Sequence, residues 1–210
     1  MTLDSISFDH SAAIDGLIER SFEAFKPPER LTVSEWAVRH RRLSPEGSAF
    51  TGRFRLETAP YQQEPMEAVN DTDVQSVVLM WASQTGKTEV INNVVGFFIC
   101  EEPSPMLILQ PTLDMAETWS KDRLAPMVRD TAVLTDLVAD AKARDSGNTV
   151  LHKRFTGGHV TVAGANSPAS LASRPIRVVL CDEVDRYPQS AGAEGDPISL
   201  AQKRSDTFFN

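Results

Sequence analysis

Residues 82–88 read Ala-Ser-Gln-Thr-Gly-Lys-Thr and lie between an apolar segment and a stretch with helical periodicity. A loop that leads into a helix N-terminus presents backbone N–H groups to an anion, and glycine lets the chain approach that anion closely. In such a loop Lys87 would contact the β- and γ-phosphates of a nucleotide, and the hydroxyl of Thr88 would bind Mg²⁺. The predicted phosphate-binding residues are Ser83, Gln84, Thr85, Gly86, Lys87 and Thr88.

The loop departs from the usual pattern G-x-x-x-x-G-K-[ST] at its first position, where Trp81 replaces the glycine. Taken alone, the tripeptide Gly86-Lys87-Thr88 is also compatible with an ordinary helix N-terminus. Its place between a predicted strand and a predicted helix favours the phosphate site.

Two adjacent acids, Asp182 and Glu183, follow the apolar segment Ile176–Cys181. ATP hydrolysis requires such a pair, because one carboxylate holds Mg²⁺ and the other polarises the attacking water. An acidic helix cap is the alternative, although a cap needs only one acid. About 95 residues separate Lys87 from Asp182, which is enough for crossover helices between parallel strands. Together the two segments predict an ATP-binding domain.

Strands and helices alternate from residue 61 onward. Apolar runs predict parallel strands that are buried on both faces, and periodic stretches predict helices between them. The predicted elements are a short helix at Tyr61–Asn70, strands at Val74–Ala82, Met106–Gln110 and Ile176–Cys181, helices at Lys87–Cys100 and Leu113–Val128, and a hairpin of Val150–Phe155 with His159–Ala163. This order predicts an α/β fold of the P-loop NTPase class, with a mostly parallel sheet flanked by helices.

The first 60 residues do not show this alternation of strands and helices. Apolar spacing predicts a helix over Ser11–Phe25, and the capping-box pattern Thr32-Val-Ser-Glu35 predicts a second helix from Thr32. Residues 43–60 are rich in Pro, Gly and Ser, which is typical of an ordered connector or short hairpin. We therefore divide the sequence into a helical appendage with its connector (1–60) and a P-loop domain (61–210).

Composition and charge exclude several classes of protein. The 210 residues are 41% hydrophobic and 24% charged, as in an ordinary globular domain, and no apolar run approaches the length of a membrane span. The net charge of −8 excludes nucleic-acid binding by the whole surface and leaves only a local patch. That patch, which a solvated helix end explains equally well, comprises Arg39, His40, Arg41, Arg42, Arg53 and Arg55.

Seven separated motifs, followed by a matching tail, carry a family resemblance. They are Leu31–Trp36, Ala59–Gln62, Trp81–Thr88, Leu109–Thr112, Phe155–Gly158, Gly164–Pro168, Leu180–Asp185 and the tail Glu194–Leu200. With these motifs the sequence resembles the N-terminal ATPase part of the large terminase subunit of tailed phages, of the lambda type. The resemblance covers nearly the whole chain from about Pro27 onward.

The resemblance implies a Mg²⁺-dependent ATPase that drives double-stranded DNA into an empty capsid. It implies ATP and Mg²⁺ as cofactors, with Lys87 on the phosphates, Thr88 and Asp182 on the metal and Glu183 as general base. It also implies that Gln62 reads adenine, although an exposed helix residue is an equal alternative.

Many family members carry an arginine finger in the phosphate loop, at the position that Ser83 occupies here. A finger from a neighbouring subunit is therefore expected, and each candidate could equally be a surface cation. The candidates are Arg174, Arg123 and Arg129. The resemblance further suggests that Asn166 and Ser167 sense the γ-phosphate, and a helix cap explains them nearly as well.

Family members also supply expected partners and a location. The expected partners are double-stranded DNA, the small terminase subunit, the portal and sister large subunits in a ring. The expected location is the host cytoplasm, at the procapsid and not at a membrane. The face that would contact the small subunit comprises Ile14, Leu17, Ile18 and Phe22. Packing of that face onto the ATPase core is the simpler explanation.

Length is the main departure from the family, whose members continue with a coupling strand and a nuclease domain. No acidic triad for DNA cleavage is evident in these residues, so endonuclease activity is expected only of full-length members. The sequence resembles a part of a longer protein or the product of a shortened gene. Two alternatives to the motor therefore stay open: a catalytically silent fragment that binds nucleotide or partners, and a helicase-like DNA translocase.

Overall fold

The computed structural model describes residues 16, 18, 21, 22, 30–138, 147–167 and 175–208. The chain divides into two compact units, Met1–Arg30 and Leu31–Asn210. Residues 31–60 thus belong to the larger unit, whereas their composition suggested a boundary after residue 60. Most of the helix predicted over Ser11–Phe25 lies outside the described residues.

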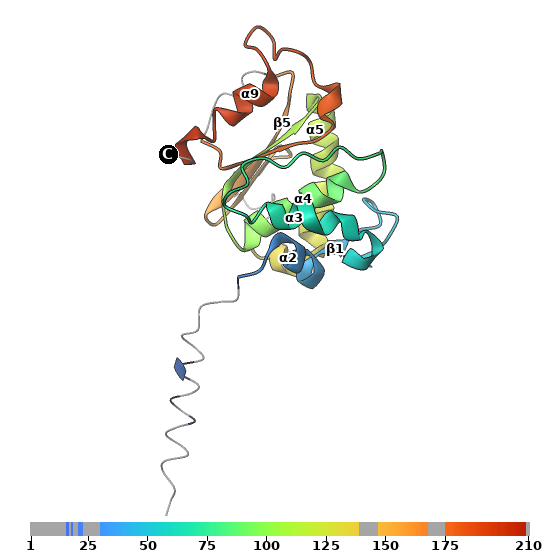
Figure 1. Cartoon of the computed structure of the whole chain (residues 1–210), viewed down its shortest axis with the longest axis vertical. Helices are drawn as coiled ribbons and strands as arrows, with labels where there is room; N and C mark the ends of the chain where they lie inside the picture. The colour runs from blue at the N-terminus through green and yellow to red at the C-terminus, as the bar shows by residue number, and fades with distance from the viewer. Residues whose placement is uncertain are drawn as a thin grey trace, which may run out of the picture. The chain divides into compact units, whose positions relative to one another are not determined.

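A four-stranded sheet forms the centre of the larger unit, in the order β4-β5-β3-β6 (Figure 1). Its strands are β3 (Pro105–Gln110), β4 (His152–Phe155), β5 (Gly158–Gly164) and β6 (Val178–Cys181). β3 pairs in parallel with β5 and with β6, and only β4 is antiparallel. The mostly parallel sheet with flanking helices confirms the predicted fold class, and the β4–β5 pair confirms the predicted hairpin.

β3 is buried on both faces because its side chains alternate between two apolar cores. Met106 and Ile108 pack with the residues of α2 and α4, whereas Leu107 and Leu109 pack with Ala201 of α9. This arrangement is the physical reason that a parallel central strand is apolar at every position. The carboxyl ends of β3 and β6 consequently lie together at one edge of the sheet.

Helices cover both faces of the sheet (Figure 1). The α-helices are α2 (Val33–His40), α3 (Gln63–Ala68), α4 (Lys87–Cys100), α5 (Leu113–Trp119), α6 (Ala125–Asp130), α7 (Ala132–Thr135) and α9 (Pro197–Gln202). α4 has the predicted bounds. The helix predicted over Leu113–Val128 is α5, a π-helical segment (Ser120–Leu124) and α6, and Pro126 at the start of α6 lacks the N–H that a regular helix would use.

α2 positions residues 31–41 against α4. It begins with the predicted capping box, in which Glu35 accepts a hydrogen bond from the Thr32 N–H at 2.8 Å and donates its own N–H to the Thr32 hydroxyl at 3.3 Å. Trp36 is fully buried and lies so close to Gly96 of α4 that a Cβ there would overlap its ring. The two helices are therefore in direct backbone-to-ring contact.

The predicted strand Val74–Ala82 is not formed. Its side chains are largely exposed, with 83% of Val78 and 94% of Met80 accessible to solvent. No hydrogen bond joins the backbone of residues 75–80 to another described residue. No described strand pairs with this segment, since β6 pairs with β3 alone, and a strand needs such a partner for its backbone N–H and C=O groups.

The connector over residues 43–60 contains a short hairpin, as one of the two expectations had it. β1 (Arg42–Leu43) pairs antiparallel with β2 (Gly52–Arg53), and Arg42 lies opposite Arg53. Short 3₁₀ turns at Leu56–Thr58 and Pro60–Gln62 then lead into α3. Among the described helices, none has the length and apolar character of a membrane span.

Candidate functional site

The predicted phosphate loop leads directly into α4. Gly86 precedes the helix with φ +86°, a left-handed conformation that favours glycine. Its carbonyl accepts hydrogen bonds from the N–H groups of Glu89 at 3.0 Å and Val90 at 3.3 Å. The first N–H groups of a helix have no intrahelical acceptor, so the loop presents a positive helix end to an anion.

Lys87 folds back onto its own loop. Its Nζ donates to the carbonyl of Trp81 at 3.0 Å and lies 3.4 Å from that of Ala82. The hydroxyl of Thr85 also donates to the Ala82 carbonyl, at 2.7 Å. The loop is thus closed on itself, and a bound phosphate would compete with these carbonyls for the ammonium group.

The two halves of the predicted site meet at Asp182. The hydroxyl of Thr88 donates to Oδ2 of Asp182 at 3.3 Å, and Nε2 of Gln110 donates to the same oxygen at 3.3 Å. Asp182 is only 6% exposed. The start of α4, the end of β3 and the end of β6 therefore converge on one buried carboxylate.

These oxygens fit Mg²⁺, which binds few protein ligands and keeps waters and phosphate oxygens as the others. Thr88 and Asp182 supply a hydroxyl and a carboxylate within 3.3 Å of each other. A cage of three or more His, Cys, Asp or Glu side chains does not occur in the described part of the chain. The donor set thus suits a shared magnesium–phosphate site.

The sheet holds Asp182 rigidly. Its N–H donates to the carbonyl of Leu109 at 3.1 Å, and the hydroxyl of Tyr187 donates to that carbonyl at 2.8 Å. Burial raises the pKa of Tyr187, so its hydroxyl remains a donor at physiological pH. Burial likewise raises the pKa of Cys181 to about 11, which keeps that thiol neutral beside the acid.

Backbone strain is concentrated at the site. Among the described residues, the non-glycine positions with positive φ are Gln84 (59°) and Glu183 (53°). Such conformations cost free energy and recur at functional sites. The Glu183 N–H donates to Oδ1 of Asp182 at 3.1 Å, and Oε2 of Glu183 lies 3.5 Å from Nε of Arg186.

Gln62 contacts the phosphate loop. It is only 4% exposed, and its Nε2 donates to the carbonyl of Gly86 at 3.3 Å. The expectation of an exposed helix residue is therefore wrong, because the side chain fills the space above Gly86. Tyr61 beside it donates its hydroxyl to the Thr85 carbonyl at 3.0 Å and packs edge-on against Trp81.

Tyr61 and Gln110 are site residues that the sequence pattern did not single out. The signal for Gln110 was available: an amide at the end of a buried strand, immediately before Pro111, lies at the same sheet edge as the two acids.

The remaining predicted residues are dispersed. Arg174 lies outside the described residues. Arg129 is exposed and bound to Glu46 at 3.0 Å and Asp130 at 2.6 Å, so its guanidinium is already paired. Asn166 is exposed on the turn after β5, in which the Ser167 N–H donates to the Gly164 carbonyl at 3.0 Å.

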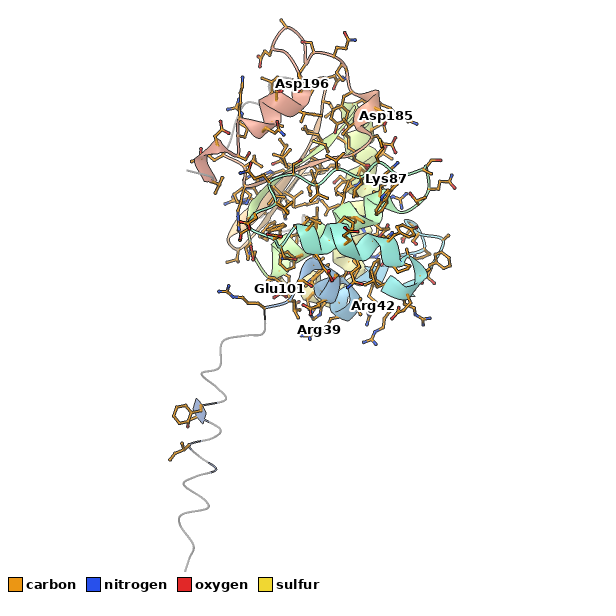
Figure 2. The ribbon with its side chains drawn as sticks, in the orientation of Figure 1. Arg39, Arg42, Lys87, Glu101, Asp185 and Asp196 are labelled. Atoms are coloured by element: carbon orange, nitrogen blue, oxygen red, sulfur yellow. The ribbon has the colours of Figure 1, made fainter. Side chains whose placement is uncertain are left out.

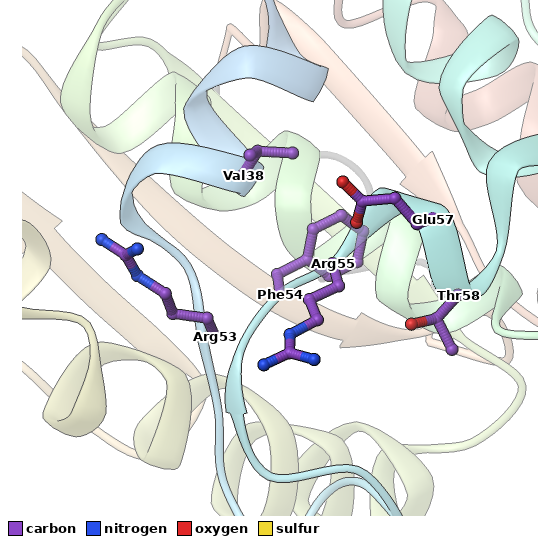
Figure 3. A pocket seen from close by; sticks show the side chains of 6 residues that line it. All are labelled: Val38, Arg53, Phe54, Arg55, Glu57 and Thr58. Atoms are coloured by element: carbon purple, nitrogen blue, oxygen red, sulfur yellow. The ribbon is translucent and has the colours of Figure 1, made fainter.

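The predicted basic patch loses one member. Arg41 is 3% exposed and forms an ion pair with Glu89 of α4 at 3.2 Å, so it does not belong to the surface. Arg53 and Arg55 are exposed and line a pocket of about 580 Å³ with Val38 and Phe54 (Figure 3).

The basic surface and the phosphate loop are separate features. Figure 2 shows Arg39 and Arg42 at one end of the larger unit, well away from Lys87 and Asp185.

A mostly parallel sheet that brings a phosphate loop and a buried acid to one edge defines a nucleotide-binding α/β protein. Residues 48–210 match the family described as "Phage terminase large subunit gpA, ATPase domain", and the chain belongs to this family.

Individual relatives agree with the family match. The chain is 29% identical over 178 residues to the terminase large subunit of Enterobacteria phage P21 and 28% identical to that of Escherichia phage lambda. These matches cover 84% of this chain but only 27% and 28% of the relatives, so the chain spans about a quarter of their length. A solved structure, the large terminase ATPase domain of Thermus phage P74-26, aligns with 20% identity and a TM-score of 0.42, over 58% of this chain and 53% of that one.

Proposed function

We propose that this chain is the ATP-hydrolysing motor domain of a phage terminase large subunit, which drives the packaging of double-stranded viral DNA into the capsid. The family match supports the ATPase class. The single observation that carries the proposal is the 3.3 Å hydrogen bond between Thr88 and Asp182, because it joins the phosphate loop to the acidic strand end.

In the proposed reaction the triphosphate of ATP binds across the loop and the start of α4. Lys87 leaves the Trp81 and Ala82 carbonyls and binds the β- and γ-phosphates instead. Its ammonium group then neutralises part of the phosphate charge. Thr88 and Asp182 would hold Mg²⁺, which would neutralise phosphate charge when bound. Gln110 keeps the Asp182 carboxylate oriented from the opposite side.

Glu183 is the proposed general base. Its backbone is fixed by the hydrogen bond to Asp182 and by the left-handed turn, and its carboxylate is only loosely held by Arg186 at 3.5 Å. The carboxylate can therefore leave Arg186 and accept a proton from a water aligned with the γ-phosphate. Its contribution is positioning plus proton transfer, as for general bases in phosphoryl transfer.

Gln62 is the proposed adenine reader. Its amide already donates to the Gly86 carbonyl, so base recognition and loop conformation would be linked through one side chain. Tyr61 reinforces this link by its bond to the Thr85 carbonyl.

The proposed partners follow from the family. Double-stranded DNA is the substrate moved. The exposed Arg39, Arg53 and Arg55 and the half-buried Arg42 are the proposed contact for its phosphates on a chain of net charge −8. The small terminase subunit, the portal and sister subunits in a ring are the other proposed partners, in the host cytoplasm at the procapsid. A sister subunit would supply the arginine finger that Ser83 replaces. Ile18 and Phe22 are exposed within the N-terminal unit, as a contact face for the small subunit requires.

Steady-state ATP hydrolysis, with and without duplex DNA, tests the function. We expect Lys87→Ala to abolish ATP binding, and Glu183→Gln to bind ATP but lose turnover by a factor of about 100 or more. Asp185→Asn, an exposed acid two positions away, is the matched control and should hydrolyse ATP like the parent. Equal turnover by the Glu183→Gln variant and the parent would contradict the role of Glu183.

The closed loop gives one reason to keep the silent fragment as a second candidate. Lys87 is bonded to its own loop, and the segment that leads into the loop is not a strand. A chain that binds ATP at the same affinity as Glu183→Gln, yet shows no turnover with DNA present, would be this silent form. A strand-separation assay excludes a helicase if duplex DNA stays intact during hydrolysis.

A further inference from the structure

A partly buried ion pair involves Glu89, two residues after the proposed phosphate-binding lysine. Nη2 of Arg41 is 3.2 Å from Oε2 of Glu89, and the side chains are 3% and 17% exposed. Glu89 is in the first turn of α4, whereas Arg41 follows α2. The pair therefore joins the residues that precede the P-loop region to the helix that would bind the triphosphate.

Arg41 is held firmly by its surroundings. Its N–H donates to the Ala37 carbonyl at 3.0 Å, its carbonyl accepts from the Phe54 N–H at 3.1 Å, and its Nη1 donates to the Arg42 carbonyl. Burial lowers the pKa of Arg41 and Glu89 opposes that change, so the guanidinium remains charged. The cation is thus fixed in place and cannot move away from Glu89.

Glu89 is held on the opposite side by Asn92, whose Nδ2 donates to Oε1 at 3.4 Å. Arg123 lies beside the same pair, and the space between these side chains is too small for a water molecule. Nε of Arg41 and Oδ1 of Asn92 have no hydrogen-bond partner among the described residues. A buried ion pair with unsatisfied atoms contributes little net stability, so its position is more informative than its strength.

Its position matters for electrostatics. A helix N-terminus attracts phosphate because its N–H groups carry partial positive charge. A partly buried carboxylate in the first turn opposes that attraction, and solvent screens it less than it would screen an exposed charge. The fixed Arg41 guanidinium cancels the charge of Glu89 and leaves the helix end positive.

We propose that Arg41 is a positioning residue for ATP, which neutralises Glu89 and fixes the first turn of α4 for the triphosphate. This inference rests on the proposed ATP-binding function. The residues around Arg41 thereby become part of the nucleotide site, although they lie outside the phosphate loop.

Isothermal titration of the 210-residue chain with ATP and with ADP tests the inference. The variants are Arg41→Met, Glu89→Gln and the double variant with both changes. The matched control is Arg177→Met, which breaks an exposed ion pair of similar length, 3.1 Å to Glu102, before the start of β6. Lys87→Ala shows whether the measured binding occurs at the phosphate loop.

We expect Arg41→Met to weaken ATP binding about tenfold, since it leaves a buried negative charge near the phosphates. ADP binding should weaken less, because ADP carries less charge. The double variant should bind ATP with an affinity within about threefold of the parent's. Glu89→Gln should bind ATP at least as tightly as the parent, and Arg177→Met should bind it with the parent's affinity.

Three results would overturn the inference. The first is parent-like ATP binding by Arg41→Met, and the second is a double variant as weak as Arg41→Met, which would indicate a merely structural pair. If Arg41→Met does not fold, Glu89→Gln decides, because weaker binding than the parent is the third contrary result. Absence of ATP binding by the parent itself would instead refute the proposed function and the inference with it.

Discussion

Two segments of this chain, residues 74–82 and β3, are both rich in apolar residues but have opposite structures. Residues Met106–Leu109 of β3 are at most 2% exposed, whereas Val78 and Met80 are 83% and 94% exposed. β3 has a parallel neighbour on each side, β5 and β6. No described strand pairs with the segment 74–82.

The difference shows that apolar composition alone does not make a strand. A buried backbone N–H or C=O without a partner costs free energy, so a segment without neighbouring strands stays where water can bind its backbone. The outer edge of β6 is unpaired in the described part of the chain as well.

The same contrast divides the candidate site. Asp182 and Glu183 follow a strand that is paired within the sheet, and Tyr187 reinforces the carbonyl that holds Asp182. The loop before Lys87 follows the unpaired segment, and side-chain bonds from Gln62 to the Gly86 carbonyl and from Tyr61 to the Thr85 carbonyl hold it. We therefore expect substitutions in the acid half to change stability more than substitutions in the segment before the loop.

The largest expected difference is between Ile108→Ala in β3 and Met80→Ala in the exposed segment. Ile108 is fully buried, so its truncation should lower the free energy of unfolding by about 2–5 kcal/mol. Met80→Ala removes an exposed side chain and should change it by less than about 0.5 kcal/mol. Urea unfolding measures both, and equal losses would mean that residues 74–82 are packed in solution.

A smaller difference is expected for two glutamines. Gln110→Met removes a donor from the buried carboxylate of Asp182, which should cost about 1.5–3 kcal/mol, and turnover should fall because the acid loses its orientation. The control is Gln75→Met, an exposed position in the unpaired segment. Thermal unfolding and ATPase rates of the two variants check this, and matched behaviour would argue against any role for Gln110.

Gly86→Ala tests the contact between the phosphate loop and Gln62. Gly86 has φ +86°, and a Cβ there would overlap Nε2 of Gln62. The variant should lose more than about 1 kcal/mol of stability. Adding Gln62→Ala relieves the overlap but not the backbone strain, so only part of the loss should return. Complete recovery in calorimetry would show that the glycine conformation itself is not required.

Local chemistry explains which elements could be predicted from the sequence. The bounds of α4, the capping box at Thr32 and the hairpin around Gly157 depend on neighbours in sequence, and each is present. Thr88 and Asp182 also converge, although the segment before the phosphate loop is not the strand on which that prediction relied.

Features that depend on distant partners could not be predicted in this way. The exposure of residues 74–82 depends on which strands lie beside them. Arg41 is one of four consecutive basic residues, and only the fold shows that it points inward to Glu89 while its neighbours face solvent or the hairpin. Gln110 gains its meaning from Asp182, 72 positions later.

The smallest expected effect compares the two strained residues, Gln84 in the loop half and Glu183 in the acid half. Both have positive φ, so glycine should relieve strain but add disorder to the unfolded chain. The turn at Glu183 is fixed by the sheet. The free energy of unfolding should therefore be about 0.5 kcal/mol higher for Glu183→Gly than for Glu183→Ala, because alanine keeps the strain.

The free energy of unfolding should be the same for Gln84→Gly and Gln84→Ala, because the loop follows an unpaired segment that can relax the strain without glycine. Chemical denaturation of the four variants measures the two differences. Equal gains at both positions would mean that the phosphate loop is held as rigidly as the strand end, and the contrast between the two halves of the site would then be lost. A gain at Glu183 alone would show that the sheet stores strain at the residue proposed to activate water, which is where a fixed carboxylate direction matters for turnover.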